Sequence, residues 1–247
     1  MSKIAFLFLV VSGINHEATW QEFLMSHEKK YSLYVHSKKP LASDSPFKKN
    51  ELETRIPTTW HNTMKAQVEL LKRALVDKQN QKFIFLSEST IPLKPFEYVY
   101  QILNTHSLSE FSFEPSPYRR RTFEPLKKET VYTNSQWVIL NRKHAELMVA
   151  DQELIEIFNK NPFDNEHYPS TFLYHHGLLQ EVKPTDRTFV FWPDHTKKHP
   201  HTFESLDIDI YLKNIIDALK DPELLFGRKF SKECDLSILK KLGLKLR

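Results

Sequence analysis

The segment KFIFLSESTIP, residues 82–92, decides the fold, because a short apolar run leads straight into a polar turn. A run rich in Phe and Ile that is bounded by a turn is typical of a buried strand. Two similar runs, Ile4–Val11 and Tyr31–Ser37, precede it, and helical patterns separate the three runs. Strands that alternate with helices are typical of a parallel α/β sheet. We therefore expect Lys82–Leu86 and the two earlier runs to be neighbouring central strands of one sheet.

The remaining elements follow weaker patterns, and the second half of the chain is less regular than the first. The expected helices are Glu17–His27, Thr63–Val76, Pro95–Leu103, Arg142–Phe158, Glu166–His176 and Asp207–Leu219, with an amphipathic helix in the tail. The further expected strands are Glu51–Ile56, Phe111–Glu114, Ser135–Leu140 and Thr188–Trp192. Since no internal repeat, low-complexity tract or linker divides the chain, we expect a single α/β domain over residues 1–247.

The composition excludes several classes of protein. The chain has 35 Lys and Arg against 31 Asp and Glu. The formal net charge of +4 is too small to indicate a surface that binds nucleic acid. Four glycines are too few to favour a glycine-rich phosphate loop. The single cysteine, Cys234, can form neither an intrachain disulfide nor a cysteine-rich metal site.

The N-terminal apolar run is short. Ile4–Val11 has eight residues, far fewer than the ~20 that span a bilayer. Lys3 before it is reminiscent of a short signal peptide, but no small-x-small cleavage site follows. We interpret the run as a buried first strand and expect the chain as given to be cytoplasmic.

Polar residues follow two of the expected central strands. His36–Lys38 ends the second strand, and Ser87–Ser89 ends the third. In an open α/β sheet, ligands bind beyond the carboxyl ends of the strands, so both groups are candidate site residues. Ordinary polar strand ends are the alternative, and spacing alone does not decide between the two.

A second candidate is the segment DNEH, residues 164–167, at the start of an expected helix. Its carboxylates either act as a general base or cap the helix, where the helix dipole favours acidic residues. Asp164 or Asn165 suits the cap position, which leaves Glu166 available for other contacts.

Three charged segments complete the candidates. Arg119–Arg121 either grips an anion or forms a solvated loop. KKHPH at Lys197–His201 could clamp a phosphate or, with less support, hold a metal. Asp207 and Asp209 form an Asp-x-Asp pattern, but they open an expected helix and are interpreted as solvated N-terminal acids. The residues alone therefore indicate an α/β domain with a cleft that suits anions.

Seven segments, taken in order, resemble the core-2/I-branching β-1,6-N-acetylglucosaminyltransferase family, particularly its plant and microbial members. They are KIAFLFLV (Lys3–Val10), YSLYVHSKK (Tyr31–Lys39), RIPTTWHNTMKAQVELLKRALVDKQNQKFIFLSESTIPL (Arg55–Leu93), NSQWVILNRKHAELMV (Asn134–Val149), DNEHYPSTFL (Asp164–Leu173), HPHTF (His199–Phe203) and LFGRKFS (Leu225–Ser231). The resemblance covers essentially the whole chain.

The resemblance implies a GT-A-like (Rossmann-like) mixed sheet flanked by helices, and inverting transfer of a sugar, GlcNAc by expectation, from a UDP-sugar. It also implies catalysis without a metal or other cofactor, and Ser87-Glu88-Ser89 stands where most GT-A enzymes carry a metal-binding Asp-x-Asp. The family's catalytic base corresponds to Glu166, and the Lys of its C-terminal Lys-Phe motif corresponds to Lys229. The family's Arg some two dozen residues earlier has no clear counterpart, and Lys197–His201 could supply that charge.

By position and by resemblance, the candidate donor-binding residues are His36, Ser87, Glu88, Ser135, Gln136, Trp137, Lys198, His199, Arg228 and Lys229, and the candidate acceptor-binding residues are Arg120 and Arg121. Asn134 replaces the usual Gly before Ser-Gln-Trp, which leaves GlcNAc, xylose or another donor sugar open. The expected partners are a UDP-sugar and a glycan or other hydroxyl acceptor, not nucleic acid, and related eukaryotic enzymes are anchored in the Golgi membrane. The alternative is a catalytically degenerate sugar-nucleotide-binding or scaffolding protein, which UDP binding without UDP-sugar hydrolysis would indicate.

Overall fold

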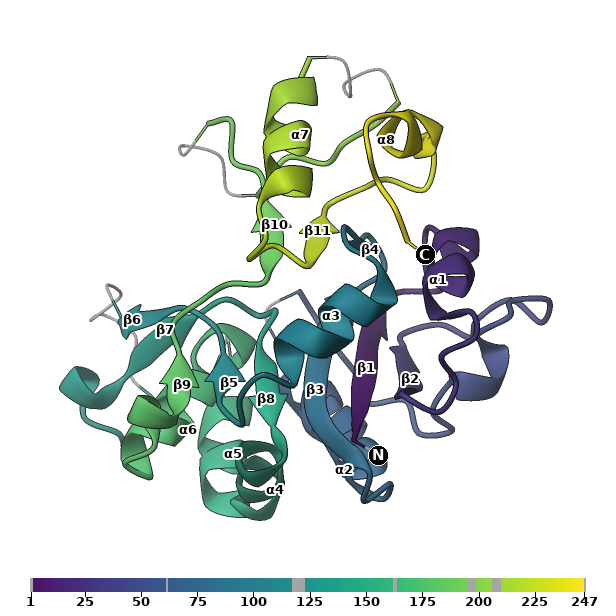
Figure 1. The fold of residues 1–247 in the computed structure, drawn as a ribbon. Helices are drawn as coiled ribbons and strands as arrows, with labels where there is room; N and C mark the ends of the chain where they lie inside the picture. Colours follow the sequence, from purple (N-terminus) through teal and green to yellow (C-terminus); the bar gives the residue numbers. More distant parts are fainter. Residues whose placement is uncertain are drawn as a thin grey trace.

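A computed structural model describes residues 2–60, 62–116, 123–161, 164–194, 199–205 and 210–246 of the protein. Its centre is a six-stranded sheet in the order β2-β1-β3-β8-β5-β9 (Figure 1). The strands are β1 (Lys3–Val10), β2 (Tyr31–Ser37), β3 (Asn80–Ser87), β5 (Ser109–Glu110), β8 (Ile139–Asn141) and β9 (Val182–Lys183). β1 pairs in parallel with β2 and β3, whereas β8 is antiparallel to β3 and β5, so the sheet is mixed. None of the helices in these ranges has the length and apolar character needed to cross a membrane.

β1 and β3 form the centre of the sheet because both of their faces are buried. Phe83 and Phe85 of β3 face one hydrophobic cluster and Ile84 faces the other, as the two-residue period of a strand requires. The carboxyl ends of β1 and β3 lie side by side, with Leu9 opposite Ser87. The three neighbouring strands expected from the sequence are therefore confirmed, except that β2 is an edge strand rather than a central one.

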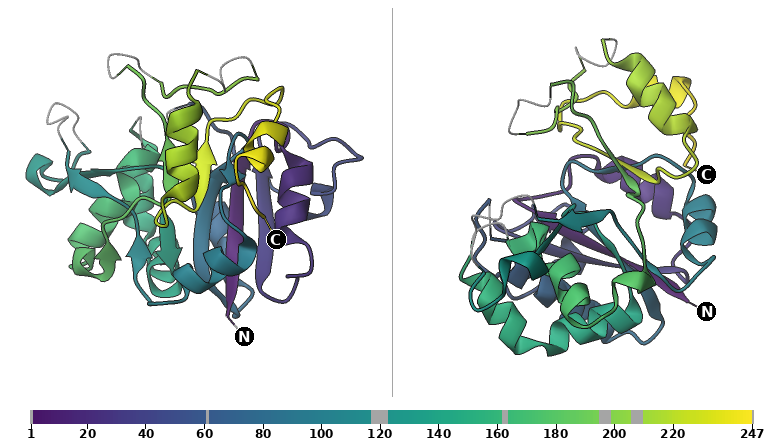
Figure 2. Two further views of the ribbon diagram at one scale, coloured as in Figure 1. Left: turned by 45° about the horizontal axis from the view of Figure 1, so that its top comes forward. Right: turned by 90° about the vertical axis from the view of Figure 1, so that its left-hand side faces the viewer.

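Helices cover both faces of this sheet (Figure 2). One face packs against α1 (Glu17–Leu24) and α3 (Phe96–Leu103), and the other against α2 (Met64–Leu75), α4 (Arg142–Ala150), α5 (Gln152–Asn159) and α6 (Tyr168–His175). α2 is typical, because Met64, Val68 and Leu71 recur at helical spacing and are all buried in the same cluster. Short 3-10 turns lie at Lys48–Asn50, Lys128–Thr130, Asp164–Glu166 and Leu179–Glu181.

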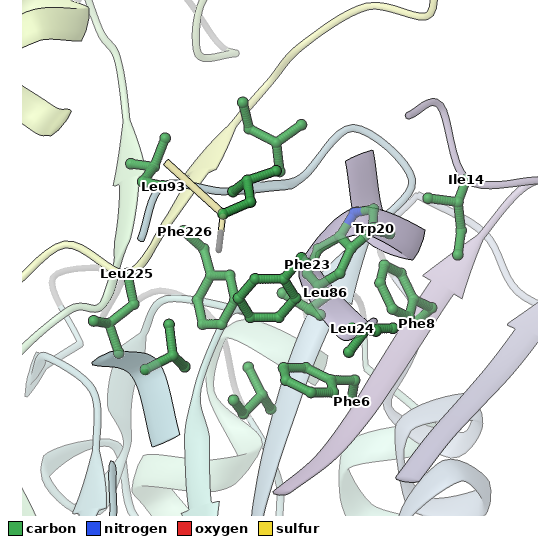
Figure 3. Packing of buried hydrophobic residues seen from close by; sticks show 14 of the residues in the cluster. Phe6, Phe8, Ile14, Trp20, Phe23, Leu24, Leu86, Leu93, Leu225 and Phe226 are labelled. Atoms are coloured by element: carbon green, nitrogen blue, oxygen red, sulfur yellow. The ribbon is translucent and has the colours of Figure 1, made fainter. Parts of the chain in front are cut away.

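The C-terminal part lies above the carboxyl ends of β1 and β3 (Figure 1). It contains β10 (Thr188–Val190), α7 (Leu212–Lys220), β11 (Phe226–Arg228) and α8 (Ser237–Lys241), and β4 (Ile91–Pro92) joins β10 and β11 in a three-stranded sheet. β6 (Phe113–Pro115) and β7 (Tyr132–Asn134) form a separate two-stranded ribbon. Phe226 of β11 stacks on Trp20 of α1 with ring centroids 6.1 Å apart, in the cluster that also holds Phe6 (Figure 3). The first and last parts of the chain thus share one core.

Two sequence expectations in the second half are wrong. Of the expected strand Ser135–Leu140 only Ile139 and Leu140 belong to a strand, because β7 ends at Asn134 and β8 begins at Ile139. The expected helix Arg142–Phe158 breaks at Asp151, whose side chain accepts a hydrogen bond from Leu154 N at 3.0 Å and so begins α5. The expected helix Asp207–Leu219 is α7, which begins at Leu212, and residues 206–209 lie outside the described part.

The expected strand Glu51–Ile56 is also wrong. In this fully described segment, Glu51 makes one isolated bridge to Val35, and the rest is irregular. The segment does not form a strand because its first residue, Glu51, turns its carboxylate inward and accepts hydrogen bonds from residues around it. Its donors are Lys48 Nζ at 2.6 Å, Arg55 at 3.0 Å, Leu41 N at 3.1 Å and the hydroxyl of Ser37.

These contacts predict a pH-dependent stability. Burial alone would raise the pKa of Glu51, but the hydrogen bonds, led by that from Lys48, outweigh it and lower the pKa to about 2. The contribution of Glu51 to the free energy of unfolding is therefore complete above the pKa of about 4.3 that a Glu has in the unfolded chain, and it is lost as the pH falls towards 2. We expect Glu51→Gln to lower the free energy of unfolding by about 2 kcal/mol at pH 7 in urea titrations, with a smaller difference at pH 3. Glu53→Gln, at an exposed position, is the control, and equal midpoints for Glu51→Gln and wild type at pH 7 would refute the assignment.

Candidate active site

Ser87 marks the carboxyl end of β3 and organises the turn that follows. Its hydroxyl lies 2.9 Å from Thr90 Oγ1 and 3.2 Å from Ser89 Oγ. The same hydroxyl accepts a hydrogen bond of 3.3 Å from Arg228 Nε, at the end of β11. The polar residues after the central strand therefore meet the C-terminal Arg-Lys pair in space.

Arg228 is almost fully buried at this junction. Its guanidinium carbon lies 4.2 Å from the centroid of the Trp137 ring, so the cation stacks on an aromatic face. Burial lowers the pKa of Arg228 to about 10, opposed by the negative charge of Glu88. The guanidinium therefore stays charged at neutral pH, although it has lost most of its hydration.

Lys229 is the second cation of the junction and is half-buried. Its ammonium lies 5.1 Å from the centroid of the Trp60 ring, and that ring meets the His199 ring edge-on at 5.1 Å. Burial lowers the pKa of Lys229, and the neighbouring charge of Arg228 lowers it further. Both causes mean that the charged form of Lys229 would be stabilised by an added anion.

Glu88 is the carboxylate whose negative charge acts on these two cations. Burial raises its pKa, while hydrogen bonds from the backbone amides of Glu88 and Val11 and the charges of Arg228 and Lys229 oppose that effect. One carboxylate against two cations leaves a net positive charge in a partly desolvated place. Such an arrangement favours a negatively charged ligand.

Backbone hydrogen bonds fix the three segments that build this place. Asn15 N, just after β1, donates to Glu88 O at 2.9 Å, and Phe230 N donates to Ser89 O at 2.9 Å. The Asn15 side chain then donates to Phe230 O, also at 2.9 Å. The residues that follow β1, β3 and β11 are thereby hydrogen-bonded to one another beside the cation pair.

Glu166 is exposed and lies beside the loop that carries Trp137. Its carbonyl accepts a hydrogen bond of 3.2 Å from Thr133 Oγ1 in β7. The next residue of β7, Asn134, is buried, and its Oδ1 accepts hydrogen bonds from Ser170 N at 3.1 Å and from Ser170 Oγ at 2.6 Å. Asn134 thus fastens the start of α6, and with it the Glu166 segment, to the residues that lead to Trp137.

The two residues between Asn134 and Trp137 shape the loop. Ser135 Oγ accepts a hydrogen bond of 3.2 Å from Trp137 N. Gln136 Nε2 donates to Thr63 Oγ1 at 3.3 Å, next to the start of α2 and three residues after Trp60. These contacts hold the Trp137 loop and the Trp60 loop together.

His36 lies apart from the cation pair. It is buried, and its Nε2 accepts a hydrogen bond of 2.9 Å from Ile56 N, while burial lowers its pKa. The neutral imidazole thus holds the segment that leads to Trp60.

The structure brings together Ser87, Glu88, Trp137, His199, Arg228 and Lys229, with Ser135 and Gln136 in the Trp137 loop. Glu166 is connected to this group through β7, where Thr133 donates to its carbonyl. Lys198, Arg120, Arg121, Asp207 and Asp209 lie outside the described residues. Among the residues that are described, no three His, Cys, Asp or Glu side chains gather closely enough to hold a metal ion.

Trp60 is the member of the site that sequence reasoning did not single out. It lies in the Arg55–Leu93 segment, and 66% of its surface is exposed although its ring contacts Lys229 and His199. A tryptophan in an otherwise polar stretch directly before a helical pattern is the sequence signal that could have identified it.

Comparison with known proteins identifies the family of the chain. The family described as Core-2/I-Branching enzyme matches residues 4–219. Glycosyltransferase BC10 of Oryza sativa subsp. japonica is 25% identical over 303 aligned positions, which cover 96% of this chain and 76% of that protein.

Solved structures with a similar arrangement share little sequence with this chain. A glycosyltransferase involved in glycosylation of the major capsid of PBCV-1 is 10% identical, with a TM-score of 0.44 over 91% of this chain and 94% of the other. The galactosyltransferase LgtC is 8% identical, with a TM-score of 0.45 over 91% of this chain and 86% of the other.

The expected GT-A-like architecture, a mixed sheet flanked by helices, is confirmed by the strand order and the helical layers. The family match spans most of the chain, from β1 to α7, and includes the Ser87 turn, the Trp137 loop and Glu166. The chain is a glycosyltransferase of the core-2/I-branching enzyme family.

Proposed function

We propose that the protein is an inverting glycosyltransferase that moves a sugar, GlcNAc in the first instance, from a UDP-sugar to an acceptor hydroxyl. The observation that carries the proposal is the pair Arg228 and Lys229, two partly desolvated cations on which the charge of one carboxylate acts. In this proposal residues 1–247 act as one catalytic domain.

The cation pair suits the diphosphate of a UDP-sugar. When the bond to the sugar breaks, a negative charge develops on the diphosphate, and preorganised donors near that charge stabilise the transition state. Arg228 offers a planar guanidinium held by Ser87 and Trp137, and Lys229 offers a mobile ammonium. Arg228 directly precedes Lys229, so it adds a guanidinium to the site without filling the position, some two dozen residues earlier, of the family's arginine.

Glu166 is the proposed general base. An acceptor hydroxyl is a poor nucleophile until a positioned carboxylate removes its proton as the new bond forms. In an inverting displacement the hydroxyl attacks from the face opposite the diphosphate, so one carboxylate is enough. The exposed position of Glu166, on a segment fastened to the Trp137 loop, supports this role.

The acceptor is proposed to be a glycan or another compound with a free hydroxyl. Arg120 and Arg121 are assigned to it from the sequence alone, since they lie outside the described residues. The small net charge of +4 argues against nucleic acid as the acceptor.

We further propose that the reaction needs no metal, and we expect EDTA to leave the rate of UDP release unchanged. The reason is that Glu88 is the single acidic residue of Ser87-Glu88-Ser89, whereas a divalent ion on a diphosphate needs more oxygen ligands. UDP release from a panel of UDP-sugars, measured with and without EDTA, checks this. Loss of activity in EDTA and its return with manganese would refute it and would point to Asp207 and Asp209.

The same panel tests the function as a whole. We expect measurable UDP release from at least one donor, with UDP-GlcNAc first and UDP-xylose second. A protein that binds UDP but releases none from any donor, with or without acceptor glycans, would instead be a sugar-nucleotide-binding protein without catalysis.

A further inference from the structure

A buried ion pair lies outside the residues assigned to the donor. Arg187 and Glu110 are 2% and 1% exposed, and Arg187 Nε donates to Glu110 Oε2 at 2.6 Å. Taking two charges out of water is costly unless their geometry and their other hydrogen bonds are good. The remaining contacts of Arg187 indicate what this buried pair does.

Arg187 holds the segment that leads into β11 at several points. Its NH1 group donates to Glu223 O at 3.0 Å and to Glu223 Oε2 at 2.6 Å. Its backbone carbonyl accepts hydrogen bonds from Leu225 N at 2.9 Å and from Phe226 N at 3.0 Å. One residue thus fixes both ends of the turn at residues 223–226.

The position of β11 follows from these contacts. β10 begins directly after Arg187 and runs parallel to β11, with Val190 opposite Arg228. At Gly227 a Cβ atom would lie 3.2 Å from the Leu93 side chain, so β11 packs closely and has little room to shift. The register that Arg187 sets at the start of β11 is therefore transmitted to Arg228 and Lys229 at its end.

Glu110 connects this register to the large sheet. It belongs to β5, and its Oε1 lies 3.9 Å from the ammonium of Lys82 and 3.6 Å from His106 Nε2. Lys82 lies in β3, the strand that ends at Ser87. The ion pair therefore joins the large sheet, whose strand β3 ends at Ser87, to Arg187, which in turn holds the start of β11.

We infer that Arg187, held by Glu110, is a positioning residue that places Arg228 and Lys229 for the donor diphosphate. This inference rests on the proposed function. A purely structural ion pair would lower stability when broken but leave the affinity of the folded protein for UDP unchanged. A positioning residue changes that affinity in protein that is still folded.

Arg187→Lys and Glu110→Gln test the inference, because each keeps the side chain's length while weakening the ion pair. In the folded variants at pH 7 we expect the Kd for UDP, measured by calorimetry, to rise about tenfold, since a displaced cation loses much of one charge-assisted hydrogen bond. Hydrogen–deuterium exchange of the amides at residues 226–229 should quicken, while exchange in β1 and β3 stays as in wild type. Glu223→Gln removes a half-exposed partner of Arg187 and should fold in any case, with a rise in Kd of about threefold.

Arg142→Lys is the matched control. The Arg142 guanidinium donates to Leu75 O at 2.9 Å, Asp77 O at 3.1 Å and Asn80 O at 2.9 Å, and so joins α2 to β3. This variant should lose thermal stability and keep the wild-type Kd for UDP.

The outcomes distinguish failure of the positioning role from failure of the proposed function. If wild type binds UDP and Lys229→Ala binds it weakly, while folded Arg187→Lys and Glu223→Gln bind it like wild type, the positioning role is refuted alone. Unchanged exchange at residues 226–229 in these variants refutes it as well. If wild type binds no UDP, the proposed function fails first and the positioning role fails with it.

Discussion

Replacing Glu166 with Gln should lower kcat by ~10²-fold or more, because the amide keeps the shape of the side chain but cannot take the acceptor's proton. The Kd for UDP should stay within about twofold of wild type, because the general base does not contact the diphosphate in this mechanism. Steady-state transfer assays at saturating donor, together with calorimetry with UDP, measure the two quantities separately.

Glu114→Gln is the control for this experiment. Glu114 is exposed in β6 and lies opposite Thr133, whose hydroxyl contacts the Glu166 segment. The control removes a nearby carboxylate of the same size and should keep the wild-type kcat. Near-normal transfer by Glu166→Gln would exclude this residue as the base, and Glu88 would be tested next.

Replacing Lys229 with Ala should raise the Kd for UDP by about 10- to 100-fold at low ionic strength, the usual range for a lost hydrogen bond to a charged group. The kcat for transfer should fall as well, because the ammonium stabilises charge on the departing diphosphate. The difference from wild type should shrink as salt is added, since Lys229 is only half-buried and its charge is screened.

Lys232→Ala is the matched control, since Lys232 is exposed three residues further along the chain. It removes the same charge from the same part of the molecule and should bind UDP like wild type. Equal UDP affinity of Lys229→Ala and Lys232→Ala at low salt would remove Lys229 from the donor site.

The elements that sequence reasoning located correctly are those whose pattern is local. β1, β2 and β3 are runs of apolar residues, and α2 repeats its apolar residues at helical spacing, so each could be identified from its own letters. Their order β2-β1-β3 departs from the rule that successive strands are neighbours, because β3 pairs with β1 and not with β2.

The features that it missed depend on individual contacts and not on a repeated apolar pattern. β11 has three residues, Phe226–Arg228, and is a strand because Arg187 and β10 pair with it. The break between α4 and α5 depends on the Asp151 cap inside an otherwise continuous helical pattern. Such contacts cannot be identified from a three-residue segment or a single polar residue.

Of the candidate site residues, the structure places some together, whereas another is held in a separate contact. Ser87, Trp137, Arg228 and Lys229 were candidates from the sequence, and the structure places them together. His36 was a candidate because it ends a strand, but its ring is turned inward to Ile56. The position of a residue along a strand indicates the edge of the sheet at which it lies, not the direction of its side chain.

The most direct test of the central claim is the anomeric form of the sugar that is first released from a UDP-α-sugar. Water can replace the acceptor hydroxyl in a slow hydrolysis, and proton NMR at early times, before mutarotation, identifies the product. An inverting enzyme with the diphosphate held by Arg228 and Lys229 and the nucleophile activated by Glu166 from the opposite face must release the β-anomer first. Release of the α-anomer, or no release from a protein that binds UDP, would contradict the account.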